Sequence, residues 1–236
     1  MTHTLVIAEL GSSWRFGYHH LGNAYKLIDA VKECGADVAK FQWTSNAGLM
    51  AMRRKLGADA IAMYDKYLMY PKYWLPSLKA HCDKVGIEFM CTVYLKEDIE
   101  VIAPLVKMSK ISAFEAEWRE FVSAHCRYEK PLIVSVNDGM KRLSFCQDIN
   151  FLYCVSKYPT PIEELHLRRR KPFDGLSDHT TSTLTGALAV AAGASIVEVH
   201  CRLDDTPSDN PDYPHSRNPT DLKTYIDNIR IAERAL

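Results

Sequence analysis

The chain has 236 residues, enough to bury one substantial hydrophobic core, so we expect a single catalytic domain over residues 1–236. Its 29 Lys and Arg residues balance 29 Asp and Glu residues, which argues against nucleic acid or an anionic membrane surface as a partner. The N-terminus does not resemble a signal peptide, no apolar run reaches membrane-spanning length, and the seven cysteines form no CxxC pair, so we expect a cytoplasmic protein.

Strand-type and helix-type segments alternate along the chain, as judged from apolar patterns with periods of 2 and 3.6 residues. In chain order we expect strand 5–11, helix 22–35, strand 37–43, helix 71–86, strand 88–94, helix 96–106, strand 108–113, helix 118–129, strand 131–136, strand 151–156, helix 162–169, strand 175–179, helix 183–193, strand 195–201 and helix 220–236. Gly35 and Gly86 mark helix ends, and Pro71 marks a helix start. The segment 139–148 is too short and polar to be assigned as a helix.

Eight apolar strands, each followed by a crossover segment, indicate a parallel sheet that is covered on both faces. We therefore predict the α/β class and a single (β/α)8 TIM barrel, with an open doubly wound sheet as the alternative. A count that stops at eight strands and an eighth helix favours closure of the sheet.

An unusual number of polar side chains lies where the strands end, which is where barrel enzymes carry their chemistry. These residues are Glu9, Lys40, Gln42, Thr92, Lys110, Ser112, Glu115, Ser135, Asn137, Ser156, Tyr158, Ser177, His179, Glu198 and His200. A lysine within an apolar strand needs a carboxylate neighbour or a bound anion. Lys40 and Lys110 therefore indicate either a lysine–glutamate network with Glu9 or Glu198, or a cationic site for a phosphate and a carboxylate.

His179 and His200 each close an apolar segment, beside Asp178 and Glu198 respectively. One such histidine alone is most often a core residue, but the pair favours a functional site. The two imidazoles suit acid–base catalysis or, equally, a divalent cation that polarises a carbonyl oxygen. A proline-rich loop with four aspartates follows at 204–215, and it forms either a solvated turn or a cover over the site.

Two further segments have simple structural interpretations. The basic run 168–171 is expected at the exposed end of a helix, where positive charge complements the helix dipole. The aromatic and Met-rich segment 50–74 is expected to pack as helices, with a subunit contact as the alternative.

The chain resembles the sialic acid synthase (N-acetylneuraminate synthase) family of phosphoenolpyruvate-condensing enzymes. The resemblance is carried by the segments 7–11, 35–42, 89–92, 110–112, 130–135, 158–161, 175–180, 193–200 and 210–212, which include Gly175-Leu-Ser-Asp-His-Thr180 and Ile196-Val-Glu-Val-His200. Their order and spacing across nearly the whole chain make the match fairly specific.

This resemblance implies a transferase that adds phosphoenolpyruvate to the aldehyde of an amino sugar such as N-acetylmannosamine, releasing phosphate and leaving a 2-keto acid. It implies that His179 and His200 bind a divalent metal, Mn²⁺ or Mg²⁺, that polarises the aldehyde. The phosphoenolpyruvate site then comprises Lys40, Thr92, Lys110, Ser112, Ser135, Ser156 and Ser177. The catalytic and sugar-contacting residues are Glu9, Gln42, Glu115, Tyr158 and Asp212. The resemblance also implies a homodimer.

The sequence departs from the family pattern at several places. His19-His-Leu-Gly22 stands where an Asn-His-x-Gly element is usual, and Phe114 occupies a usually small position. Family members normally continue beyond the eighth helix into an antifreeze-like domain. These departures leave two alternatives: a metal-dependent aldolase or isomerase that does not use phosphoenolpyruvate, and a catalytically silent binding barrel.

Overall fold

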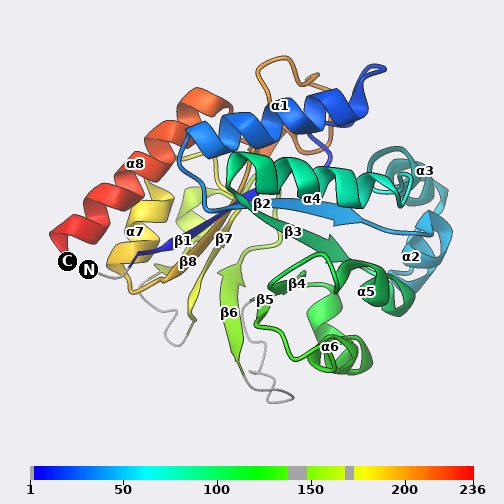
Figure 1. Ribbon diagram of the computed structural model, residues 1–236. Coiled ribbons are helices and arrows are strands. Elements are labelled where there is room, and N and C mark those ends of the chain that lie inside the picture. The colour runs from blue at the N-terminus through cyan, green and yellow to red at the C-terminus, as the bar shows by residue number, and fades with distance from the viewer. Residues whose placement is uncertain (1–2, 138–147, 168–172) are drawn as a thin grey trace.

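The computed structural model describes residues 3–137, 148–167 and 173–236. Eight parallel strands form one sheet in the order β3-β2-β1-β8-β7-β6-β5-β4 (Figure 1). Their bounds are β1 Leu5–Glu9, β2 Val38–Trp43, β3 Glu88–Val93, β4 Ser109–Ile111, β5 Leu132–Val136, β6 Ile149–Cys154, β7 Gly175–Asp178 and β8 Ile196–His200. Strands β3 and β4, at the two ends of this order, contact each other, so the sheet curls into a nearly closed barrel. The predicted TIM barrel is confirmed, and the open sheet is not observed.

Helices surround this barrel. They are α1 His20–Glu33, α2 Ala47–Arg53, α3 Ala58–Tyr67, α4 Trp74–Val85, α5 Lys96–Ile102, α6 Arg119–Cys126, α7 Thr185–Ala191 and α8 Pro219–Ala235. Helix α1 packs against both α4 and α8, and the chain before β1 lies beside the end of α8, where the Thr4 backbone N–H donates to Glu233 Oε1 at 2.6 Å. Gly86 ends α4 in the left-handed conformation, with φ of 73°, as the glycine stop predicts. Among the described residues, no helix is long and apolar enough to cross a membrane.

One predicted helix is wrong over its described part. Within its described residues, 162–167, the segment expected as helix 162–169 forms no α-helix but the short 3-10 helix Ile162–Glu164. Leu165 leaves the helical region, with φ of −88° and ψ of 88°, so the turn cannot continue as an α-helix. The basic run 168–171 and most of the segment 139–148 lie outside the described residues.

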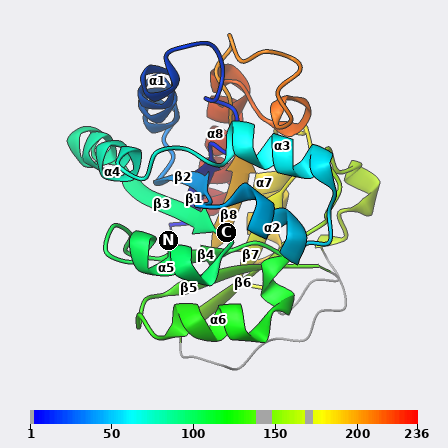
Figure 2. The same cartoon turned by 90° about the vertical axis from the view of Figure 1, so that its right-hand side faces the viewer.

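Two short helices, α2 and α3, follow β2 and pack on each other before α4 returns along the barrel (Figure 2). They build a separate hydrophobic cluster in which Met50, Tyr64 and Tyr67 meet Tyr94 and Leu95 from the end of β3. The helical packing predicted for this segment is therefore confirmed. It places an aromatic wall beside the ends of β2 and β3.

The barrel interior is layered because alternate residues of each strand face inward. The lowest layer is an apolar cluster formed by Ile7, Val38, Met90, Ile133, Leu152 and Ile196. Two residues further along the strands, polar residues replace them: Glu9 follows Ile7, Lys40 follows Val38, and Glu198 follows Ile196. The apolar floor thus sets a buried polar layer at the carboxyl end of the strands.

Helix α6 carries a buried histidine away from these layers. His125 is 5% exposed, neither ring nitrogen has a hydrogen-bond partner among the described residues, and burial lowers its pKa to about 4. Below pH 6.5 the His125 imidazole therefore binds a proton in the unfolded chain but not in the folded protein. The unfolding free energy falls as the pH drops toward 4. Between pH 7.5 and pH 5, we expect wild type to lose about 2 kcal/mol more unfolding free energy than His125→Leu, measured by urea denaturation.

Parallel curves for wild type and His125→Leu would contradict the assignment of a buried neutral imidazole.

Candidate active site

Two lysines and two glutamates fill the polar layer above the apolar floor. The Lys40 ammonium contacts the Glu9 carboxylate and donates a hydrogen bond to Thr92 Oγ1 at 3.1 Å. Glu198 lies between the lysines, with its two oxygens 3.5 Å from Lys40 Nζ and 3.5 Å from Lys110 Nζ. All of these groups are buried. The lysine–glutamate network, one of the two sequence-based interpretations, is therefore present.

Serine hydroxyls complete this layer. Lys110 Nζ donates to Ser135 Oγ at 2.8 Å, and Ser177 Oγ donates to Glu198 Oε1 at 2.9 Å. Five of the seven residues predicted for phosphoenolpyruvate thus lie together: Lys40, Thr92, Lys110, Ser135 and Ser177. The other two, Ser112 and Ser156, line the mouth above them.

Opposite charges in this layer attract one another within the buried interior of the barrel. Burial alone would raise the pKa of Glu198, but Lys110, Lys40 and the hydrogen bond from Ser177 lower it to about 2. Burial lowers the pKa of Lys110, and the attraction of Glu198 offsets that effect only in part. Glu198 is therefore an anion at neutral pH that holds both lysines in place.

The two predicted histidines stand at the end of this layer. His200 ends β8 and His179 follows β7, and their ring centroids are 5.5 Å apart. His179 Nδ1 lies 3.0 Å from the Val155 carbonyl oxygen, so the donating tautomer leaves Nε2 with its lone pair. The Tyr158 ring packs on His179 with centroids 4.3 Å apart. The structure therefore brings Tyr158 and both histidines together, as the sequence predicts.

The imidazoles are kept neutral by their surroundings. Burial lowers the pKa of His179, and burial together with the neighbouring imidazoles lowers the pKa of His200 well below its usual value. His200 Nδ1 is buried without a hydrogen-bond partner from residues 3–137, 148–167 or 173–236. A neutral, unpartnered ring nitrogen suits a metal ligand, and carboxylate oxygens lie nearby, so the donor set fits a divalent cation.

The loop after β8 brings Asp212 to this point. The Ser12 backbone N–H donates to Asp212 Oδ2 at 2.6 Å, and Ser12 Oγ donates to Asn210 Oδ1 at 2.8 Å. Gly11 permits this approach, because a Cβ atom there would lie 2.1 Å from Asp212 Oδ2 and its φ is +40°. The same loop carries His215, which the sequence reasoning missed as a site residue. Its only sequence signal was a position inside the aspartate-rich loop.

A second residue missed from the sequence is Arg54, which follows α2. Arg54 Nε and Nη2 donate to Glu115 Oε1 at 2.8 and 2.7 Å, and the Ser112 hydroxyl also contacts Glu115. Nearby, Tyr94 donates to Gln42 Oε1 at 2.6 Å. The predicted sugar-contacting residues are therefore divided between this arginine-bound cluster and the histidine cluster.

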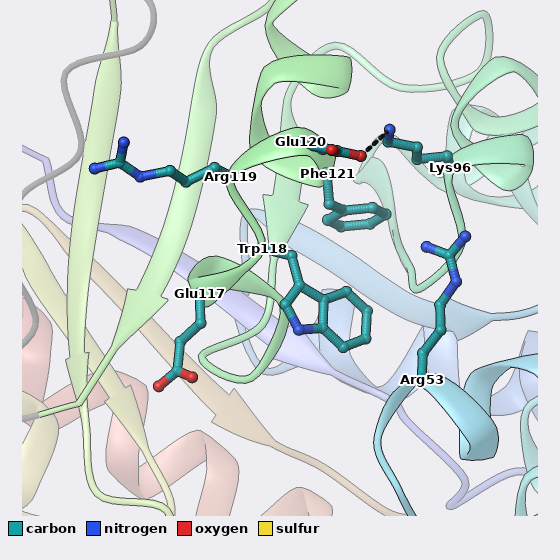
Figure 3. A pocket seen from close by; sticks show the side chains of 7 residues that line it. All are labelled: Arg53, Lys96, Glu117, Trp118, Arg119, Glu120 and Phe121. Atoms are coloured by element: carbon teal, nitrogen blue, oxygen red, sulfur yellow. Dashed lines mark hydrogen bonds and ion pairs between the residues drawn. The ribbon is translucent and has the colours of Figure 1, made fainter.

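One cavity of about 410 Å³ joins the two clusters. Its lining includes Gln42, Arg54, Ser112, Ser156, Tyr158, His200, Asp212 and His215, with aromatic side chains of α3 on one side. A cavity of this size holds a small metabolite and combines an apolar wall with convergent polar groups. A separate, more open hollow between α2, α5 and α6 is lined by Arg53, Lys96 and Trp118 among others, and contains none of the predicted site residues (Figure 3).

Comparison with solved structures supports the fold. The N-acetylneuraminic acid synthetase of Leptospira borgpetersenii, solved in complex with citrate, superposes with a TM-score of 0.85 over 99% of this chain and 85% of that one, at 22% identity. Among curated relatives, a pseudaminic acid synthase of Campylobacter jejuni is 31% identical over 98% of this chain and 74% of its own length. An N,N'-diacetyllegionaminic acid synthase of the same species is 28% identical over 100% of this chain and 78% of its own.

The NeuB family model matches residues 27–236. The chain belongs to the NeuB family. The relatives reported above are sugar acid synthases by name, so the sequence resemblance to the sialic acid synthase group is confirmed. The match begins before β2 and ends at the last residue, so it spans the strands that carry both lysines and both histidines.

Proposed function

We propose that this NeuB protein is a transferase that condenses phosphoenolpyruvate with the aldehyde of an amino sugar to give a sialic-acid-type 2-keto-3-deoxy acid. In this reaction the methylene carbon of phosphoenolpyruvate forms a bond to the aldehyde carbon. One water is consumed and inorganic phosphate leaves. N-acetylmannosamine is the model substrate.

The observation that carries the proposal is the stacking of two unlike layers in one barrel. The lower layer offers two ammonium groups and three hydroxyls, which suit the phosphate and carboxylate of phosphoenolpyruvate. The upper layer offers neutral imidazoles and a carboxylate, which suit a divalent ion. A small molecule spanning both layers would have its anionic end below and its reacting carbon near the histidines.

The roles of the individual side chains follow from these positions. Lys40 and Lys110 bind the anionic groups, and Glu9 and Glu198 hold the lysines in position. A divalent ion, Mn²⁺ or Mg²⁺, bound with His179 and His200 would supply Lewis-acid polarisation of the aldehyde oxygen. Gln42, Tyr158 and Asp212 orient the sugar at the mouth, and Glu115 acts beside them from the Arg54 cluster.

The test is phosphate release by the full chain with phosphoenolpyruvate, Mn²⁺ and a panel of 2-acetamido aldoses that includes N-acetylmannosamine. We expect release that requires the aldehyde and is abolished by a chelator, together with a 2-keto acid product detected by mass spectrometry. Turnover of an aldose without phosphoenolpyruvate would favour the aldolase or isomerase alternative. Absence of phosphate release with every aldehyde would reject the synthase.

The homodimer and the cytoplasmic location inferred from the sequence stay predictions. Light scattering on the purified chain would test the first, and cell fractionation the second.

A further inference from the structure

His215 is buried without a hydrogen bond to its side chain among the described residues. It ends the 3-10 helix Tyr213–His215, is 3% exposed, and neither of its ring nitrogens has a hydrogen-bond partner in the part of the chain that the structure describes. A buried polar group without a partner is costly, and native structures almost always satisfy it. We therefore expect a bound group that interacts with an imidazole nitrogen at this position.

The surroundings of His215 identify that group. Its Nε2 lies 3.6 Å from Asp212 Oδ1, while His200 Nδ1 lies 4.0 Å from the other oxygen, Asp212 Oδ2. The rings of His200 and His215 have centroids 4.5 Å apart. One ligand atom from each of these three residues lies within 4.8 Å of the others. Two ligands at about 2.1 Å from one ion are separated by roughly 3.0–4.2 Å, so these spacings are close to those of a metal centre.

The support around the three residues is rigid. Strand β8 fixes His200, the Ser12 backbone N–H fixes Asp212, and Tyr158 packs against the His215 ring at 5.1 Å between centroids. Metal sites require such positioning of the ligands by neighbouring groups. His179 lies on the far side of the cluster, 6.3 Å from His215 between ring centroids.

We propose that His215 is a metal ligand together with His200 and Asp212, so that two imidazoles beside one carboxylate make the centre selective for a first-row transition ion over Mg²⁺. Imidazole binds such ions well, whereas Mg²⁺ prefers oxygen ligands and retains its waters. This inference deepens the metal component of the proposed function, but it does not depend on phosphoenolpyruvate or a sugar.

The test compares two buried histidines in the metal-stripped full chain, titrated with Mn²⁺ and followed by the EPR signal of the free ion. His215→Leu should weaken Mn²⁺ binding at least about tenfold, as loss of a metal-site group does. His125→Leu is the matched control, because His125 is equally buried and also has two unpartnered nitrogens, but lies on α6. It should bind Mn²⁺ within twofold of wild type. A hundredfold excess of Mg²⁺ should not displace Mn²⁺ from wild type.

A second readout compares the bound metal in wild type with the metal in a conservative variant. Pulsed EPR should detect couplings from at least two imidazoles in the wild-type Cu²⁺ form and one fewer in His215→Gln, and the visible spectrum of the Co²⁺ form should change in the same variant. Unchanged Mn²⁺ affinity in His215→Leu, with loss of binding in His179→Leu, would overturn the proposal. So would a single imidazole coupling in wild type.

The two proposals fail separately. Metal binding that depends on His215 without phosphate release from any aldehyde would reject the synthase and support this centre. Phosphate release with a Mn²⁺ affinity that is independent of His215 would support the synthase and reject this centre.

Discussion

Lys110→Met is expected to lower kcat/KM for phosphoenolpyruvate by about 10²–10³-fold, the usual effect of removing one preorganised electrostatic contact from a dry site. Lys110 is 3% exposed, donates to Ser135 and lies 3.5 Å from Glu198, so its charge acts with little screening by water. Steady-state phosphate release measures the effect. Full retention of kcat/KM would exclude Lys110 from the phosphoenolpyruvate site.

The control for this variant is Lys107→Met. Lys107 precedes the same strand, but its side chain is 80% exposed and pairs with Glu88 at the surface. An exposed pair contributes little, so we expect kcat/KM and stability within error of wild type.

A folding defect can be separated from a catalytic one at the same position. Lys110→Met leaves Glu198 with Lys40 as its remaining cation, and breaking a buried ion pair costs about 3–5 kcal/mol. The double variant Lys110→Met/Glu198→Gln removes the uncompensated charge and should recover much of that stability. It should not recover activity, because the ammonium group is still absent.

Arg54→Met is expected to lower the unfolding free energy by about 3–5 kcal/mol, because it leaves a fully buried carboxylate without its cation. Glu115 is 0% exposed and receives two hydrogen bonds from the Arg54 guanidinium. For a chain of this length, we expect a fall in Tm of roughly 10 °C. Arg54→Lys should recover part of the stability, since it restores the charge but not the two-pronged contact.

Arg53→Met is the matched control, one residue earlier on α2. Arg53 is exposed and lines the separate hollow of Figure 3, so its replacement should change stability by less than about 0.5 kcal/mol. Calorimetry and urea denaturation measure both variants. Equal stability of Arg54→Met and Arg53→Met would show that the buried contact to Glu115 does not hold α2 on the barrel.

Most of the barrel was predictable because its signals are local. A strand points alternate residues to the same side of the sheet. Each charged side chain therefore lies one layer above the apolar residue two positions earlier, as in the pairs Ile7 and Glu9, Val38 and Lys40, and Ile196 and Glu198. The helix predicted after β6 was wrong because the backbone leaves the helical conformation at Leu165, although the apolar pattern continues beyond it.

At the metal end of the site, the positions of two histidines follow from the sequence, whereas the other two residues are placed only by the tertiary structure. The sequence by itself determined that His179 and His200 face one end of the barrel, because each terminates a strand whose direction and side-chain alternation are set locally. Only the tertiary structure decided that Asp212 and His215 join them, because the loop that carries both is anchored by Ser12, 200 residues away from Asp212 in the chain. The contact of Arg54 with Glu115, 61 residues apart, is likewise decided only by the tertiary structure. No local pattern encodes such contacts, since they form only when the closed barrel brings the carboxyl ends of its strands together.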